Sequence, residues 1–221
     1  MPVLSRTVLA ALIVPLTCLF CISAWGQSSS SHGASDIGSP FKHFDSACEH
    51  CVQLNHKAVA REIRHGIKFL NDETKYAGIK GRQALQGSAT ELAKVASSIE
   101  GGKTFTADQL KDRFARAHHA LAVHHHQVAE NARSENRLGE ASKALKAAAV
   151  NLKHGVSWTG ENLIVKPGAK IVDSSIKVTG GLIDGTLGGT GKGVKAIGNG
   201  IGLLGDKIKR VGKVIKDTTR R

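Results

Sequence analysis

The chain has 221 residues, 25 of them glycine, and its 31 Lys and Arg against 18 Asp and Glu give a formal net charge of +13. Hydrophobic residues make up 41 %, which excludes a fully disordered chain, and aromatic residues make up 4 %, too few for a ring-lined substrate cleft or a base-stacking platform. No catalytic motif is present, so the sequence predicts a protein that is not an enzyme and identifies no small-molecule substrate.

The first 26 residues have the pattern of a secretory signal peptide. Arg6 supplies the positive start, an apolar run extends from Val8 to Cys21, and Ala24-Trp25-Gly26 places small residues at positions −3 and −1 of a cleavage site. An uncleaved anchor is the alternative, but the apolar run is short for a membrane span and polar residues follow it. We therefore expect an exported protein that is periplasmic or secreted. Its positive charge is compatible with peripheral attachment to a membrane.

After a flexible leader at residues 27–38, helical periodicity begins at Ser39-Pro40, an N-cap followed by proline. The periodicity predicts one amphipathic helix that ends near Gly78. Its apolar positions are Phe44, Cys48, Val52, Val59, Ile63, Ile67 and Leu70. The adjacent carboxylates Asp72 and Glu73 are expected near its end, in solvated or helix-dipole roles.

Two further helices are predicted. One carries the stripe Leu85 to Ile99 and stops at Gly101-Gly102, and Thr106 with Gln109 forms a capping box for the next. This third helix has a seam of period near 3.5 from Leu110 to Leu152, with Gly139 as the place for a break or kink. The predicted fold is mainly α: a helical hairpin or three-helix bundle over residues 39–155, followed by a glycine-rich amphipathic segment over 156–221.

The C-terminal segment combines glycine with a helical stripe. Residues 176–217 hold 12 glycines, and Gly181, Gly185, Gly189 and Gly193 recur every fourth residue, a spacing that permits close approach of another backbone. Because each glycine costs a helix about 0.5–1 kcal/mol relative to alanine, a helix should form here only against another surface. Its stripe is Ile176, Ile183, Leu187, Val194, Ile197, Ile201, Leu204, Ile208, Val211 and Ile215.

Three interpretations of this segment stay open: it binds an anionic membrane surface, it packs on the bundle or on a second copy, or it is a flexible tail. A basic cluster favours the first, in which a basic amphipathic helix lies on anionic lipid. The cluster consists of Lys207, Lys209, Arg210, Lys213 and Lys216. Nucleic acid is not favoured as a partner, because the segment from residue 176 onwards has no aromatic residue and few arginines.

Cys48 and Cys51, spaced i, i+3, fit a local disulfide, a pair of buried thiols, or half of a Zn or Cu site. Eleven histidines accompany them, and the run His118-His119 to His124-His125-His126 contains no i, i+3 or i, i+4 pair. A metal site would therefore need ligands from a second helix, such as His50, Cys48 or Cys51, with His118, His124 and His125 as candidates on the run. The favoured interpretation of the run is a solvated polar face, with His124 tolerated at the apolar seam. A distinct hypothesis is acid sensing, in which histidines at the seam become protonated near pH 6 and loosen the bundle.

The leading functional hypothesis is an exported, non-enzymatic protein whose C-terminal segment binds anionic membranes or self-associates. The alternative is an exported Zn- or Cu-binding protein that uses the Cys48/Cys51 pair and histidines.

Overall fold

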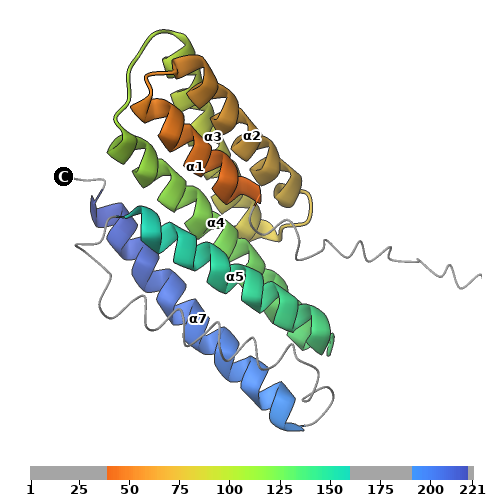
Figure 1. Cartoon of the computed structure of the whole chain (residues 1–221). Coiled ribbons are helices and arrows are strands. Elements are labelled where there is room, and N and C mark those ends of the chain that lie inside the picture. Colours follow the sequence, from red (N-terminus) through yellow and green to blue (C-terminus); the bar gives the residue numbers. More distant parts are fainter. Residues whose placement is uncertain (1–38, 160–190, 219–221) are drawn as a thin grey trace, which may run out of the picture. The chain divides into compact units, whose positions relative to one another are not determined.

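The structure is a computed structural model that describes residues 39–159 and 191–218, and it is drawn in Figure 1. Within these ranges the chain is all-helical, which confirms a mainly α fold. The helices are α1 (Ser39–Val52), α2 (His56–Thr74), α3 (Ile79–Glu100), α4 (Ala107–Ser134), α5 (Leu138–Trp158) and α7 (Gly191–Thr218). None of the helices in these ranges is both long and apolar enough to cross a membrane. The predicted signal peptide and leader, and Gly181, Gly185 and Gly189, lie outside the described residues.

The single helix predicted from Ser39 to Gly78 is wrong, because the chain breaks between α1 and α2. At the break Leu54 has φ 57°, in the left-handed region, and Asn55 starts α2 by accepting a hydrogen bond from the Ala58 amide at 3.2 Å. The apolar stripe keeps its helical spacing on both sides of the break. Periodicity therefore could not reveal it, and Asn55 was the one local signal for a helix start.

The long third helix is also two helices. The break lies at residues 135–137, where Asn136 has φ 57°, and not at Gly139, which lies inside α5 with no neighbouring atom close to where a Cβ would be. The short turn makes α4 and α5 an antiparallel pair, and Gly155 lets α5 approach the Ala115 carbonyl of α4, 3.3 Å from an ideal Cβ. The seam of period 3.5 thus spans two packed helices.

Other local predictions are confirmed. Helix α3 ends at Glu100, before Gly101 and a left-handed Gly102 with φ 89°. Thr106 caps α4 by accepting from the Gln109 amide at 3.2 Å, while the Gln109 side chain accepts from the Thr106 amide at 3.0 Å. This is the reciprocal capping box that the sequence predicts.

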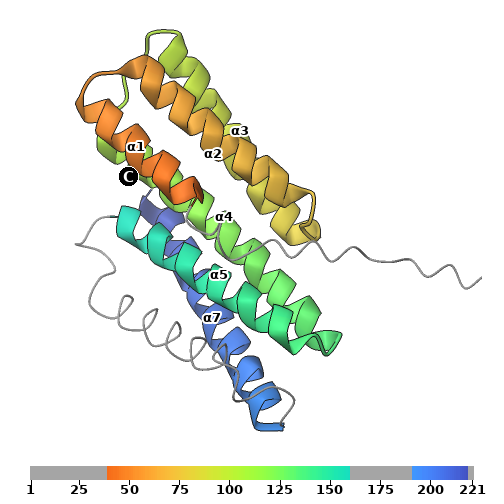
Figure 2. The ribbon, with the colours of Figure 1, turned by 45° about the vertical axis from the view of Figure 1, so that its right-hand side comes forward.

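Helix α4 contacts more of the other helices than any other described helix: it packs against α1, α3, α5 and α7. Figures 1 and 2 show α5 and α7 beside it, with α1, α2 and α3 packed together. One hydrophobic core runs through the six described helices. It includes a stacked pair of fully buried rings, Phe44 of α1 and Phe114 of α4, with centroids 4.4 Å apart. The α4–α5 part of this core is rich in alanine, which allows the two backbones to lie close.

The left-handed Leu54 gives a testable prediction. Its side chain is 75 % exposed, so Leu54→Gly removes little buried surface and relieves a backbone conformation that costs a non-glycine residue about 1–2 kcal/mol. Glycine also adds freedom to the unfolded chain, so we expect a net gain of about 0.5–1 kcal/mol in the free energy of unfolding. Urea denaturation followed by circular dichroism measures it.

Val52 provides the matched control, since its side chain is 76 % exposed but its backbone is helical. Val52→Gly should leave stability unchanged or lower it slightly. A loss of stability in Leu54→Gly as large as in the control would show that the left-handed conformation carries no strain.

Candidate functional site

The C-terminal helix α7 buries one face against α4 and α5. The predicted stripe forms this face from Ile197 onwards, and each of its members is at most 8 % exposed. They are Ile197, Ile201, Leu204, Ile208, Val211 and Ile215. Val194 is half-buried, and the earlier stripe positions Ile176, Ile183 and Leu187 lie outside the described residues. Within the structure, therefore, the apolar side of the segment packs on its own bundle.

Two histidines of α4 form hydrogen bonds to the backbone of α7. The Nε2–H of His119 donates to the Ile208 carbonyl at 2.9 Å, and the Nε2–H of His126 donates to the Ile201 carbonyl at 2.8 Å. The donors are seven residues apart and so are the acceptors. A backbone carbonyl has two lone pairs, so each can accept the ring N–H in addition to its intrahelical partner. The bonds fix the register of α7 along α4.

Glycines of α7 make room for these rings. An ideal Cβ at Gly205 would lie 2.9 Å from His126 Nε2, and one at Gly212 would lie 2.7 Å from His119 Nε2. One heptad further along, a Cβ at Gly198 would lie 2.8 Å from the Arg133 guanidinium. We call this contact the α4–α7 seam. Its members are His119, His126 and Arg133 of α4 and Gly212, Gly205 and Gly198 of α7, paired antiparallel at seven-residue intervals.

Sequence reasoning missed the seam. It singled out glycines spaced by four, of which only Gly193 falls within α7, at a position where side-chain surroundings are not described. The signal that could have found the seam is a pair of matching heptads, large polar residues at 119, 126 and 133 and glycines at 198, 205 and 212. Matching repeats of this kind indicate two helices packed along one register.

The expectation of a solvated histidine face is wrong for His118, which is fully buried. The Asn151 side-chain nitrogen donates to the Ala147 carbonyl, so its oxygen faces His118 and accepts from Nδ1–H at 3.0 Å. Nε2 is then the unprotonated nitrogen, and among the described residues it has no hydrogen-bond partner. Burial, opposed by the bond to Asn151, lowers the pKa of His118 to about 3. His118 is therefore a neutral core residue and joins α4 to α5.

His124 is buried at 2 % exposure, in keeping with its predicted place at the apolar seam. Of the solvated and helix-dipole roles expected for Glu73, the solvated one is wrong. Glu73 is 9 % exposed at the end of α2, and its carboxylate accepts from His124 Nε2–H at 3.1 Å. His125 lies beside them, and burial lowers its pKa to about 4. One potential ligand atom from each of the three residues lies within 4.8 Å of the others. Two members of this group come from α4 and the third, Glu73, comes from α2. From the sequence alone, the Glu73 carboxylate was not considered as a metal ligand.

Cys48 and Cys51, the two cysteines among the described residues, are free thiols. Cys48 is buried, which raises its pKa to about 12, and Cys51 donates its thiol to the Phe105 carbonyl at 3.2 Å. Neither belongs to a group of three potential metal ligands among the described residues, and neither does His50. A thiolate is the form that binds metal, so burial disfavours Cys48 as a ligand.

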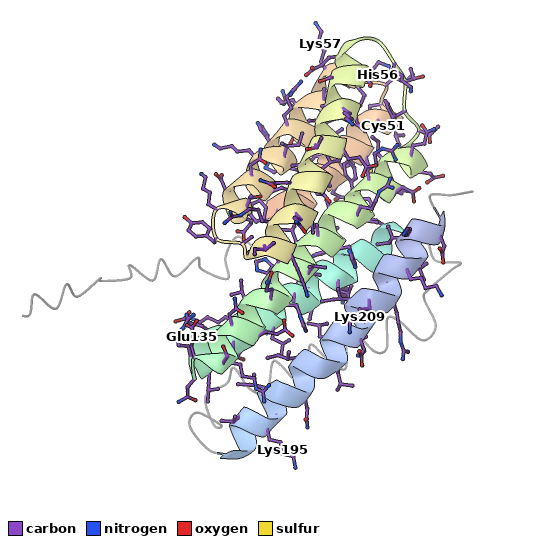
Figure 3. The ribbon with its side chains drawn as sticks, turned by 180° about the vertical axis from the view of Figure 1, so that it is seen from behind. Cys51, His56, Lys57, Glu135, Lys195 and Lys209 are labelled. Atoms are coloured by element: carbon purple, nitrogen blue, oxygen red, sulfur yellow. The ribbon has the colours of Figure 1, made fainter. Side chains whose placement is uncertain are left out.

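The face of α7 away from the stripe is basic. Across Gly191–Thr218 there are seven Lys and Arg and two Asp, a net charge of 7 − 2 = +5. Five of the basic side chains are exposed: Lys195, Lys209, Arg210, Lys213 and Lys216. Figure 3 shows Lys195 near one end of the helix and Lys209 further along it. Lys207 is half-buried, and desolvation lowers its pKa. Four of the five predicted cluster residues are thus exposed on one helix.

No family model, curated protein or solved structure matches the chain.

The α4–α7 seam predicts the effect of side chains at its glycines. Gly205→Val should lower the free energy of unfolding by about 1–3 kcal/mol, because the new side chain meets the His126 ring and displaces it from the Ile201 carbonyl. Gly202 is the control, since its ideal Cβ would meet nothing within 4 Å. Gly202→Val should change stability by no more than about 0.5 kcal/mol. Urea titrations of both variants test this, and equal losses would contradict the seam.

The buried histidines predict a dependence of stability on pH. Burial lowers the pKa of His118 to about 3 and also lowers that of His119, whose bond to Ile208 opposes the effect. In the unfolded chain both histidines should have a pKa of about 6.5. Below this pH the unfolded chain therefore binds more protons than the folded one. The free energy of unfolding should therefore fall as the pH drops from about 6.5 toward about 3.

The measurement is the urea midpoint at a series of pH values across this window. His118→Gln keeps a side chain that can donate to Asn151 and should make the acid slope shallower than in the wild type. A midpoint that does not change below pH 6.5, or a variant slope equal to that of the wild type, would contradict the assignment.

Proposed function

We propose that this is an exported, non-enzymatic protein that binds anionic membrane surfaces through α7. The observation that carries the proposal is the division of α7 into a stripe of apolar side chains at most 8 % exposed and an opposite face with five exposed basic side chains. Such division into an apolar and a cationic face is typical of helices that lie in the interface of a membrane.

The basic face supports a first step that needs no change in structure. Lys209, Arg210, Lys213 and Lys216 are exposed while the helix is docked, and each Lys or Arg near an anionic surface contributes about 1 kcal/mol of attraction. The acidic residues of α7 are Asp206 and Asp217. Asp206 lies 4.0 Å from Lys209, an exposed pair that contributes little in water. The helix therefore attracts anionic lipid as a docked element.

The buried stripe supports a second step. Leu204 and its neighbours now face α4 and α5, and the same side chains could enter the acyl boundary of a membrane if α7 left the bundle. The α4–α7 seam opposes this step, because leaving the bundle breaks the bonds from His119 and His126. Attraction by the basic face and insertion of the stripe are thus separable events on one helix.

Co-sedimentation of residues 27–221 with vesicles tests the first step. The chain should bind phosphatidylcholine vesicles that contain phosphatidylserine and should not bind vesicles of phosphatidylcholine alone. Replacing Lys209, Arg210, Lys213 and Lys216 together by Gln should weaken binding at least about tenfold, since four charges contribute up to about 4 kcal/mol.

The matched control replaces four exposed lysines of α2 and α3, Lys57, Lys68, Lys80 and Lys94, by Gln. Lys57 is labelled in Figure 3. Both variants lose the same net charge, so a general electrostatic attraction would weaken equally in both. Binding that survives in the α7 variant, or equal losses in the two variants, would refute the role of α7.

A further inference from the structure

We propose that Glu73, His124 and His125 hold a Zn²⁺ ion between α2 and α4. This inference is independent of the membrane role of α7. It also differs from a site built on Cys48 and Cys51, because neither cysteine lies in the group.

The geometry requires little movement. One potential ligand atom from each residue lies within 4.8 Å of the others, and His124 Nε2 is already 3.1 Å from Glu73 Oε2. In a tetrahedral zinc site with bonds of about 2.0–2.2 Å, ligand atoms are separated by about 3.4 Å. Two ligand atoms that are now 4.8 Å apart would therefore have to approach each other by about 1.4 Å, which side-chain rotation can supply.

The donor set has the chemistry of a zinc site. Two imidazoles and one carboxylate bind Zn²⁺ as three protein ligands with a position left for water. His125 is half-buried, while His124 and Glu73 are buried. When Zn²⁺ takes Nε2 of His124, the imidazole binds as a neutral ligand with its ring proton moved to Nδ1, a buried nitrogen that has no hydrogen-bond partner among the described residues. The loss of the His124–Glu73 hydrogen bond and the burial of this N–H oppose zinc binding, and the metal–ligand bonds must outweigh both.

The position of Glu73 in α2 favours a cation. It lies one residue before the end of the helix at Thr74, where the helix dipole presents its negative end. The last turn of α2 has no basic residue, and Lys75, which follows it, pairs with Asp72 at 2.7 Å. A divalent ion at Glu73 would therefore interact favourably with both the carboxylate and the helix end.

Neighbouring helix α3 holds His124 in place. An ideal Cβ at Gly81 would lie 3.2 Å from the Cα of His124 and 3.3 Å from its Nδ1, so α3 packs directly on the residue. The Gly81 amide also donates to the Gln127 side chain of α4 at 3.1 Å. Helix α3 packs against both α2 and α4 and so connects the two helices that carry the proposed ligands. Ligands held on packed helices favour metal affinity.

A second group, His43, Glu62 and His65, serves as an internal comparison. It also brings three potential ligand atoms within 4.8 Å, but His65 is exposed and the others are half-buried. Its Glu62 carboxylate accepts from His43 at 2.8 Å and lies 3.2 Å from Arg61 Nε. Two of the three residues in the group at Glu73 are buried and none of the three in this group is, so we expect zinc to prefer the group at Glu73.

Calorimetric titration of the full chain with ZnCl₂, with thiols reduced, tests the proposal. We expect one equivalent of Zn²⁺ to bind with micromolar or tighter affinity. Glu73→Gln should weaken that affinity at least about tenfold, as should His125→Gln. The amide oxygen in Glu73→Gln can still accept the His124 hydrogen bond, so circular dichroism should show an unchanged fold.

Two control variants locate the ion. Glu62→Gln and the double variant Cys48→Ser, Cys51→Ser should each bind Zn²⁺ as the wild type does. The proposal is overturned if the wild type binds no stoichiometric zinc, if Glu73→Gln binds as tightly as the wild type, or if the loss appears in either control. His125→Gln keeps the test decisive if Glu73→Gln fails to fold, because no described hydrogen bond depends on that ring.

Discussion

The packing of the described helices depends on where the histidine rings of α4 find partners for their N–H groups. A neutral imidazole inside a protein carries one donor that must be satisfied, because leaving a buried polar group unpaired costs free energy. His118 donates to α5, His119 and His126 donate to α7, and His124 donates to α2. Histidines of one helix thus bind three different neighbours, and α4 holds the fold together through polar contacts as well as its apolar core.

Helix α7 shows how a sequence poor in helix formers can still form a helix. Its glycines lower helix propensity, so its stability depends on burial of the stripe against α4 and α5. The seam glycines are also the reason the two backbones approach closely enough for ring-to-carbonyl bonds, since a Cβ at Gly205 or Gly212 would occupy the space of the ring. The residues that weaken α7 as an isolated helix are those that fit it to α4.

The two proposals use different parts of the same histidine-rich helix. The contact with α7 involves His119 and His126, whereas the proposed zinc ligands are His124 and His125, with Glu73 of α2. His119 and His126 are seven residues apart and therefore lie on the same side of α4, toward α7, whereas His124 faces Glu73 of α2. The membrane proposal depends on the exposed basic face of α7, and the zinc proposal depends on a buried group that α7 does not contribute to.

The sequence by itself determined the helical class, the capping box at Thr106, the end of α3 at Gly101-Gly102 and the spacing of the apolar stripe from Ile197. These follow from local spacing and from side chains that bond their own backbone, which one stretch of chain contains in full. Apolar periodicity could not locate the breaks at Leu54 and Asn136, because it continues across both, and the capping residue Asn55 was the one local signal at the first of them. The tertiary structure alone decided the pairing of Glu73 with His124 and of His119 and His126 with α7, since burial and partners of polar side chains depend on helices distant in sequence.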